Sequence, residues 1–190
     1  MKISKRHQQI HSFFSGFALP QATERLANSI KAATSDKIWK GRSPADLLWF
    51  MEELEKLLSI VFRIIEEKNF YDEAIIAEKS NESVWQLARY ETYCGRHAKS
   101  HPWDFFPRHL SKKEFLNPYH AMKKVCNAFT KEEWKTSQKT ILQHALSRHP
   151  VSEFDDSFNP LRIFILLHKL LEAAHLVEVR VNNEMMNCEL

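Results

Sequence analysis

Apolar residues recur at helical spacing along most of this 190-residue chain, and the clearest stretch covers about 43–68. Ser43 and Pro44 are typical of the N-cap and the first position of a helix. After them, successive apolar residues are four, three, four, three and four positions apart: Leu47, Met51, Leu54, Leu58, Val61 and Ile65. This is the period of an α-helix with one buried face. The pattern therefore predicts a helix about 39 Å long, at 1.5 Å per residue, and we expect it to be the central helix of a bundle.

The same periodicity predicts shorter helices on both sides of this one. Pro118 and Pro160 each follow an asparagine, and this pair is typical of a helix start. Thr130 and Glu133 have the spacing of a capping box, which marks a third start. The expected helices cover about 3–16, 21–33, 70–78, 80–94, 118–128, 131–147 and 160–176.

Two segments do not fit a helical period. Residues 101–110 contain two prolines, which exclude a continuous helix and indicate a loop. Residues 177–181 alternate between valine and a charged residue, which predicts a short extended tail.

These elements predict an all-α fold. We expect a single domain over 1–190, built as an irregular bundle of about seven helices around the helix at about 43–68. The ends, 1–20 and 177–190, are expected to be mobile. The chain has only three glycines and lacks the glycine-rich motifs that bind phosphate or present a nucleophile. Side chains rather than main-chain loops are therefore expected to contact any ligand, and we predict no catalytic residue and no cofactor.

The three cysteines and the hydropathy pattern restrict where the protein works. The cysteines are odd in number and do not form a CxxC motif, which is typical of a reducing compartment. No stretch approaches the roughly 20 apolar residues that a membrane-spanning helix needs. We therefore expect a cytoplasmic protein that makes no contact with a membrane.

The net charge is only +3, but the charges are distributed unevenly. Residues 94–150 carry eleven lysines and arginines against four acids, whereas 43–93 carry five against eleven. One hypothesis is that the basic region binds nucleic acid or another polyanion. Its binding residues would be Lys123, Lys124, Lys131, Lys135 and Lys139. The alternative is that oppositely charged helices lie side by side and neutralise one another.

The last predicted helix carries a candidate metal site. His168, Glu172 and His175 are at positions i, i+4 and i+7, which fall within about 60° of arc around a helix. Imidazole and carboxylate groups are common ligands of transition metals. The alternative is that these side chains pack at the edge of the core, with Glu172 as the hydrogen-bond partner of the histidines.

The loop at 101–110 is rich in aromatic residues. Trp103, Phe105 and Phe106 would form a partner-binding patch if they were exposed. If they were buried, the same side chains would close one end of the bundle.

The leading hypothesis from these patterns is a non-enzymatic helical interaction or regulatory module. It would act through contacts with a protein partner or with a second copy of itself, because the apolar face at 43–68 and the aromatic loop both offer contact surface. Two further hypotheses are a nucleic-acid or polyanion-binding protein that uses the basic 94–150 region, and a metal-dependent helical-bundle enzyme centred on the last helix.

Overall fold

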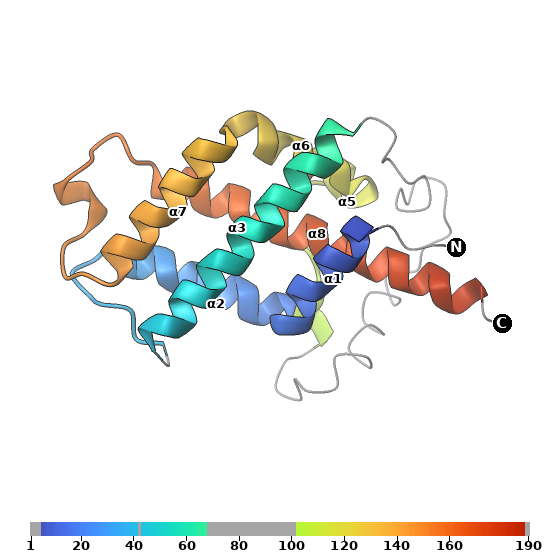
Figure 1. Cartoon of the computed structure of the whole chain (residues 1–190), viewed down its shortest axis with the longest axis horizontal. Helices are drawn as coiled ribbons and strands as arrows, with labels where there is room; N and C mark the ends of the chain where they lie inside the picture. The colour runs from blue at the N-terminus through green and yellow to red at the C-terminus, as the bar shows by residue number, and fades with distance from the viewer. Residues whose placement is uncertain (1–4, 42, 68–101, 189–190) are drawn as a thin grey trace.

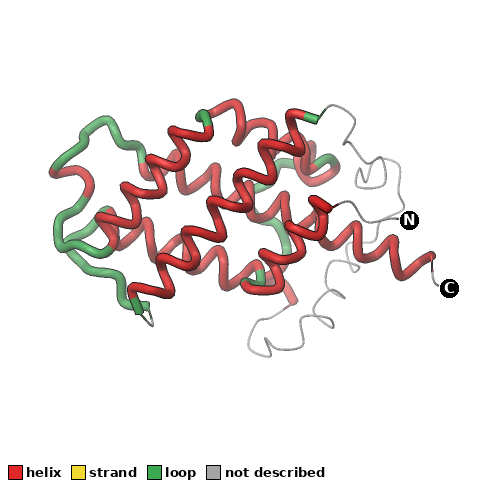
Figure 2. The backbone as a smooth tube through the Cα atoms, viewed as in Figure 1, coloured by secondary structure: helices red, strands yellow, loops and turns green. Residues whose placement is uncertain are grey.

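The computed structural model of the protein describes residues 5–41, 43–67 and 102–188. These residues form seven α-helices and two short 3-10 helices, η4 and η5, and contain no strand (Figures 1 and 2). The helices are α1 (Lys5–Gly16), α2 (Leu19–Ala33), α3 (Pro44–Glu66), η4 (Pro102–Phe105), α5 (Lys112–Leu116), α6 (Pro118–Ala128), α7 (Lys131–Ala145), η5 (Val151–Glu153) and α8 (Pro160–Cys188). The predicted all-α bundle is confirmed, while the helices expected at 70–78 and 80–94 lie outside the described residues.

Local capping signals explain where several helices begin. The Ser43 hydroxyl accepts a hydrogen bond from the Asp46 N–H at 3.2 Å, as an N-cap does. Thr130 and Glu133 form the predicted capping box at the start of α7. A second capping box, between Ser111 and Glu114, begins α5, a five-residue helix that the periodicity did not predict because it is too short to show a period.

Helix α8 is the most enclosed element of the bundle. It packs against α1, α2, α5 and α6, and α3 crosses in front of it in Figure 1. Every residue over 170–181 is buried. Helix α3 belongs to the same core, as predicted, but one of its faces is open to solvent, where Leu48 and Trp49 are 45% and 44% exposed. The helix with a long stretch buried on all sides, over 170–181, is therefore α8 rather than α3.

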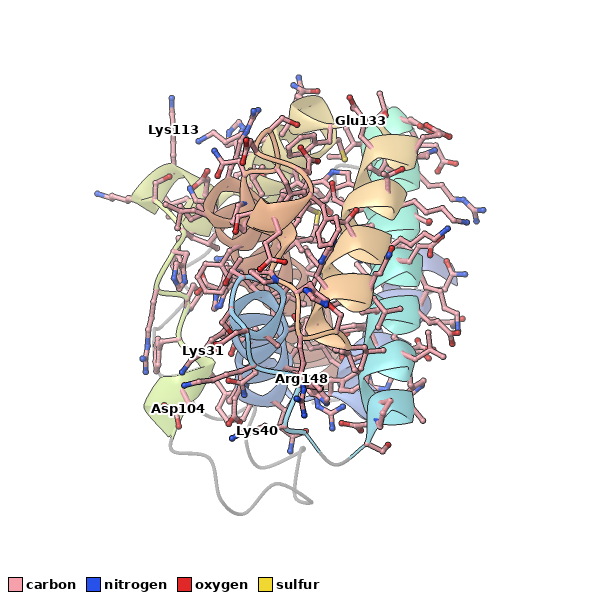
Figure 3. All side chains as sticks on the ribbon, turned by 90° about the vertical axis from the view of Figure 1, so that its left-hand side faces the viewer. Lys31, Lys40, Asp104, Lys113, Glu133 and Arg148 are labelled. Atoms are coloured by element: carbon pink, nitrogen blue, oxygen red, sulfur yellow. The ribbon has the colours of Figure 1, made fainter. Side chains whose placement is uncertain are left out.

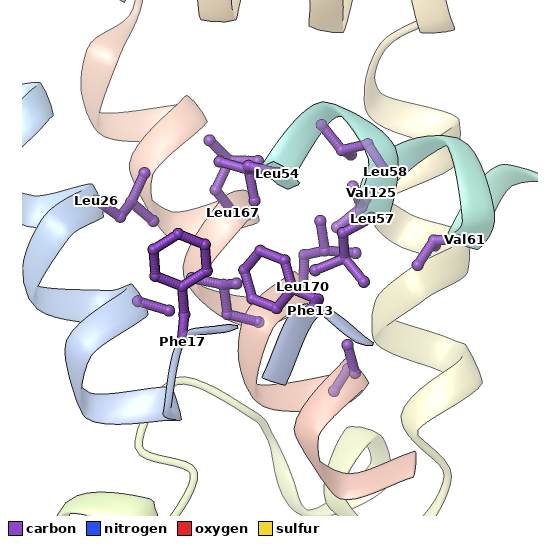
Figure 4. Close-up of a cluster of buried hydrophobic side chains, with 14 of the residues drawn as sticks. Phe13, Phe17, Leu26, Leu54, Leu57, Leu58, Val61, Val125, Leu167 and Leu170 are labelled. Carbon is purple, nitrogen blue, oxygen red and sulfur yellow. The ribbon is translucent and has the colours of Figure 1, made fainter. Parts of the chain in front are cut away.

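A single hydrophobic cluster joins most of the helices. Side chains from the α1, α2, α3, α6 and α8 regions meet in it, as Figure 4 shows: Phe13, Phe17, Leu26, Leu54, Leu57, Leu58, Val61, Val125, Leu167 and Leu170. Burying one such side chain contributes about 1.5–3 kcal/mol. The cluster thus holds together helices that are far apart in the sequence. No helix in the described part of the chain is both long enough and apolar enough to cross a membrane.

The extended tail predicted for 177–181 is wrong, because α8 continues through it to Cys188. The alternation there arises because this part of the helix is buried on all sides, so that its polar residues need partners within the protein. Glu178 is paired with His11 of α1. Arg180 donates a hydrogen bond to the Phe115 carbonyl oxygen at 2.9 Å and lies over the Phe115 ring. Tertiary contacts, not strand pairing, explain the charged residues in this segment.

Candidate functional site

A cleft of about 370 Å³ lies between α2, α8 and the connecting segment at 104–110, which comprises the end of η4 and the residues that lead to α5. This volume is within the range of about 300–1,000 Å³ that is usual for small-ligand sites. Polar side chains reach the cleft from all three elements: Thr23 and Glu24 from α2, Asp104, Arg108 and His109 from the connecting segment, and His168 and Glu172 from α8.

Glu172 holds the connecting segment against α8. Its side chain is almost completely buried, and its carboxylate accepts four N–H groups. Oε1 accepts from the backbone N–H of Arg108 at 2.8 Å and lies 2.9 Å from Nδ1 of His109. Oε2 accepts from the backbone N–H groups of His109 and Leu110 at 2.8 and 3.1 Å. A carboxylate can only accept, so Nδ1 of His109 carries the proton, and Glu172 fixes the orientation of that ring.

His168 lies one helical turn before Glu172, and its ring packs against that of His109 with the centroids 4.3 Å apart. The residue is 8% exposed. Its Nδ1 atom is buried and has no hydrogen-bond partner among the described residues. Burial, together with the nearby charge of His109, lowers the pKa of His168 to about 4, despite the opposing effect of Glu172. His168 is therefore a neutral imidazole near pH 7, the form that ligates metals.

The three side chains converge on one point. One ligand atom from each of His109, His168 and Glu172 lies within 4.8 Å of the other two. Zinc ligands lie about 2.0–2.2 Å from the ion for nitrogen and oxygen, so neighbouring ligand atoms in a tetrahedral site are roughly 3.3 Å apart. Small rotations of the side chains would bring this set to that spacing, with the cleft on its open side.

His175, the third residue of the predicted metal set, is not part of this group. It is 1% exposed and packs between the rings of Phe14 and Phe105, with centroid distances of 5.3 and 6.0 Å. Burial lowers its pKa to about 3. The structure thus keeps the predicted pair of His168 and Glu172 together, adds His109 and places His175 in the aromatic core.

The predicted polyanion-binding lysines are mostly paired with carboxylates of this chain. Lys124 pairs with Glu114 at 2.7 Å, Lys131 with Glu66 at 2.9 Å and Lys135 with Glu55 at 3.2 Å. The last two pairs join α7 to α3, so the alternative of neutralising helices holds for them. The other two, Lys123 and Lys139, are exposed. Polyanion binding stays a prediction, but three of the five lysines on which it depends are already paired with carboxylates.

The aromatic segment is largely built into the protein. Phe105 is 2% exposed, in contact with His175. Phe106 is half-buried, borders the cleft and packs against Leu176 and Val179. The side chain of Trp103 lies outside what the structure describes. Phe105 therefore helps to close one side of the bundle, as the second alternative predicts, and it is not accessible to a partner in this conformation.

Large apolar side chains are exposed elsewhere. Several of them lie at the end of the bundle where the loops at 34–41 and 146–159 meet (Figure 1). The backbone N–H of Trp39 donates to the Ala145 carbonyl oxygen at 2.8 Å and joins the first loop to the end of α7. Figure 3 views this end, where Lys40 and Arg148 project from the loop regions. The exposed apolar residues of the two loop regions and the nearby start of α8 are Ile38, Leu146, Phe154, Leu161 and Ile165.

Comparison of the chain with protein-family models, characterised proteins and solved structures found no match. The chemistry of the cleft is therefore the main basis for a function.

Proposed function

We propose that this protein is a helical module that binds a transition-metal ion of the Zn²⁺ class at His109, His168 and Glu172. The observation that supports it most directly is the convergence of three ligand-type side chains from two distant parts of the chain. One further feature of the group is common in metal sites. His168 is neutral near pH 7, and it has a buried nitrogen that lacks a partner among the described residues.

The hydrogen-bond pattern of Glu172 indicates where the ion binds. Four N–H groups donate to its two oxygens, and three of the four belong to the backbone; the backbone N–H of His109 is shared between both oxygens. The fourth is the imidazole N–H of His109. An ion that replaces this one proton gains a ligand from both residues and leaves the three backbone hydrogen bonds intact. His168 supplies a third ligand, and a fourth position remains for water or for a group in the cleft.

Calorimetric titration of the metal-free protein with Zn²⁺ tests this function. We expect one ion per chain, and affinity lowered roughly 100-fold or more in His109→Ala and in His168→Ala, because each variant loses a ligand. His120→Ala, which alters an exposed histidine of α6, is the matched control and should bind as the wild type does. Circular dichroism checks that each variant is folded. Absence of Zn²⁺ binding by folded wild type at micromolar concentrations would refute the proposal.

A second candidate function is a non-enzymatic interaction module that acts through protein contacts, including contacts between copies of this chain. The exposed apolar residues at the loop end support it, with Phe154 and Leu161 being 69% and 65% exposed. Light scattering coupled to size exclusion tests the self-associating form. We expect the wild type to associate increasingly as its concentration rises. A Phe154→Ser/Leu161→Ser variant should not associate. A wild type that stays monomeric at high concentration would exclude self-association.

A further inference from the structure

A serine, a histidine and a glutamate meet where α1 packs against α8, and none of the three lines the cleft. His11 and Ser15 are four positions apart on α1, so their side chains lie on the same face of the helix. The Oγ atom of Ser15 is 3.3 Å from Nε2 of His11. On the other side of the ring, Nδ1 of His11 is hydrogen-bonded to Oε1 of Glu178 on α8. One imidazole therefore joins a hydroxyl group to a carboxylate.

Glu178 determines which nitrogen of His11 carries the proton. The Glu178 side chain is 2% exposed, and its carboxylate can only accept a hydrogen bond, so Nδ1 of His11 donates to it. The lone pair of the neutral ring is then on Nε2, next to the Ser15 hydroxyl. A hydroxyl, an imidazole that can take its proton, and a buried carboxylate that orients the imidazole are the groups that activate a serine as a nucleophile.

The hydroxyl proton of Ser15 has two acceptors within reach. The Oγ atom lies 2.9 Å from the backbone carbonyl oxygen of His11, in addition to being 3.3 Å from Nε2 of the same residue. Rotation about the Cβ–Oγ bond turns the proton from the carbonyl oxygen to Nε2 and moves no heavy atom. The contact with the helix backbone therefore does not prevent proton transfer to the imidazole.

A substrate can reach both the hydroxyl and the imidazole from solvent. Ser15 is exposed, and the side chain of His11 is 59% exposed. The half-exposed ring of Trp49 packs beside Gly16, the residue that follows the serine: a Cβ atom at Gly16 would lie 3.6 Å from it. Residues 7–16 of α1 include no lysine, arginine, aspartate or glutamate. An uncharged helix surface near an aromatic ring fits a neutral substrate with an apolar or aromatic part.

We propose that Ser15, His11 and Glu178 hydrolyse small, uncharged esters. Ser15 and His11 are the catalytic residues, and Glu178 is a positioning residue that acts through His11. The three residues are different from those of the metal site, and the proposal does not depend on a metal ion.

The reaction has two halves. In the first, Oγ of Ser15 forms a bond to the carbonyl carbon of the ester while its proton passes to Nε2 of His11. The bond between that carbon and the alcohol oxygen then breaks, and the departing alcohol takes the proton from Nε2. In the second half, water bonds to the carbonyl carbon of the acyl-serine and gives a proton to Nε2. Breaking the bond to Oγ releases the acid and returns the proton to Ser15.

Hydrolysis of p-nitrophenyl acetate, measured with EDTA present so that no metal ion contributes, tests the proposal. We expect Ser15→Ala and His11→Ala each to lower kcat/KM about tenfold or more, because one variant lacks the nucleophile and the other lacks the base. Ser12→Ala, which alters another exposed serine of α1, is the matched control and should be as active as the wild type. Circular dichroism checks that each variant is folded. Ser15 is exposed, so Ser15→Ala keeps the test decisive if His11→Ala does not fold.

Two further measurements assign the roles of the residues. Mass spectrometry of wild type quenched with acid during turnover should find an acetyl group on Ser15. In folded Glu178→Gln, kcat should fall about tenfold or more, because the imidazolium loses the charge that stabilises it, while KM stays within about twofold of the wild-type value. A residue with only a structural role would leave kcat unchanged in the folded variant.

Three results would overturn the proposal. The first is a wild type that hydrolyses the ester no faster than buffer does. The second is equal activity in wild type and Ser15→Ala, including the case in which only His11→Ala loses activity, since the imidazole would then attack the ester by itself. The third is an acetyl group that is found on other residues but not on Ser15.

Discussion

His109 and Glu172 are 63 positions apart in the sequence, yet Nδ1 of the histidine lies 2.9 Å from Oε1 of the carboxylate. The same carboxylate accepts the backbone N–H groups of Arg108, His109 and Leu110. One buried charge on α8 therefore fixes the path of the segment before α5 and the orientation of its histidine. The cleft owes its shape to this arrangement.

Replacing Glu172 should destabilise the protein. In Glu172→Gln the charge is lost, and the amide nitrogen cannot accept the N–H groups that one carboxylate oxygen now accepts. We expect the free energy of unfolding to fall by about 2–4 kcal/mol, measured by urea denaturation. Glu24→Gln, an exposed residue of the same cleft, is the control and should change it by less than about 0.5 kcal/mol. Equal effects of the two substitutions would mean that Glu172 does not hold the segment.

Glu114 should make stability depend on pH in the acidic range. Burial alone would raise its pKa, but hydrogen bonds from Lys124, Lys169 and Ser111 outweigh burial and hold the pKa at about 2. In the unfolded chain the value is about 4.5. The stabilisation is therefore complete above pH 4.5 and is lost as the pH falls towards 2, by up to about 3 kcal/mol.

Unfolding measured between pH 6 and pH 3 checks this effect. Glu114→Gln should remove that part of the pH dependence. Glu132→Gln, at an exposed position of α7, should keep it. A pH profile that is the same in Glu114→Gln and wild type would contradict the assignment.

His175 should make the free energy of unfolding depend on pH in a higher range than Glu114 does. Burial lowers the pKa of this histidine to about 3 from an ordinary value of 6.5. Below pH 6.5 the unfolded chain binds a proton that the folded protein excludes, so stability declines as the pH falls from 6.5 towards 3. The slope is at most about 1.4 kcal/mol per pH unit. Chemical denaturation measures the free energy of unfolding at pH 7 and at pH 5. The difference between these two values should be smaller in His175→Leu than in the wild type. The same difference in both proteins would argue against a neutral, buried His175.

Two glycines offer a matched test of packing next to tryptophan rings. A Cβ atom at Gly41 would lie 2.4 Å from three atoms of the Trp39 ring, whereas one at Gly16 would lie 3.6 Å from Trp49, an ordinary contact. Gly41→Ala should therefore lower the free energy of unfolding by about 1–3 kcal/mol and alter tryptophan fluorescence. Gly16→Ala should be neutral or stabilising by up to about 1 kcal/mol. The reverse order of stability would contradict the packing of Trp39 on Gly41.

Local signals in the sequence were sufficient for most helix starts. Pro118 and Lys131 begin α6 and α7 as predicted, because the capping residues act within one turn of the helix they start. The end of α8 could not be predicted in the same way. Its stretch at 170–181 is buried on all sides and so has no amphipathic period, and the partner of Arg180 lies in α5, far away in the sequence.

The site was predictable only in part, for a similar reason. His168 and Glu172 share one turn of α8 and do lie together. His175 shares their arc but lies about 10 Å beyond His168 along the axis at 1.5 Å per residue, where its ring packs against Phe14 and Phe105 instead. His109 comes from a segment without periodicity, and only the folded chain brings it to α8. No local pattern in the sequence could have identified it.

The most direct test of the metal site is a crystal structure of the protein grown with Zn²⁺, with anomalous data collected at the zinc absorption edge. We predict an anomalous peak about 2.0–2.2 Å from Nδ1 of His109, a nitrogen of His168 and Oε1 of Glu172, with the backbone hydrogen bonds to Glu172 preserved. No peak at this position, with Nδ1 of His109 still hydrogen-bonded to Glu172, would contradict the proposed function.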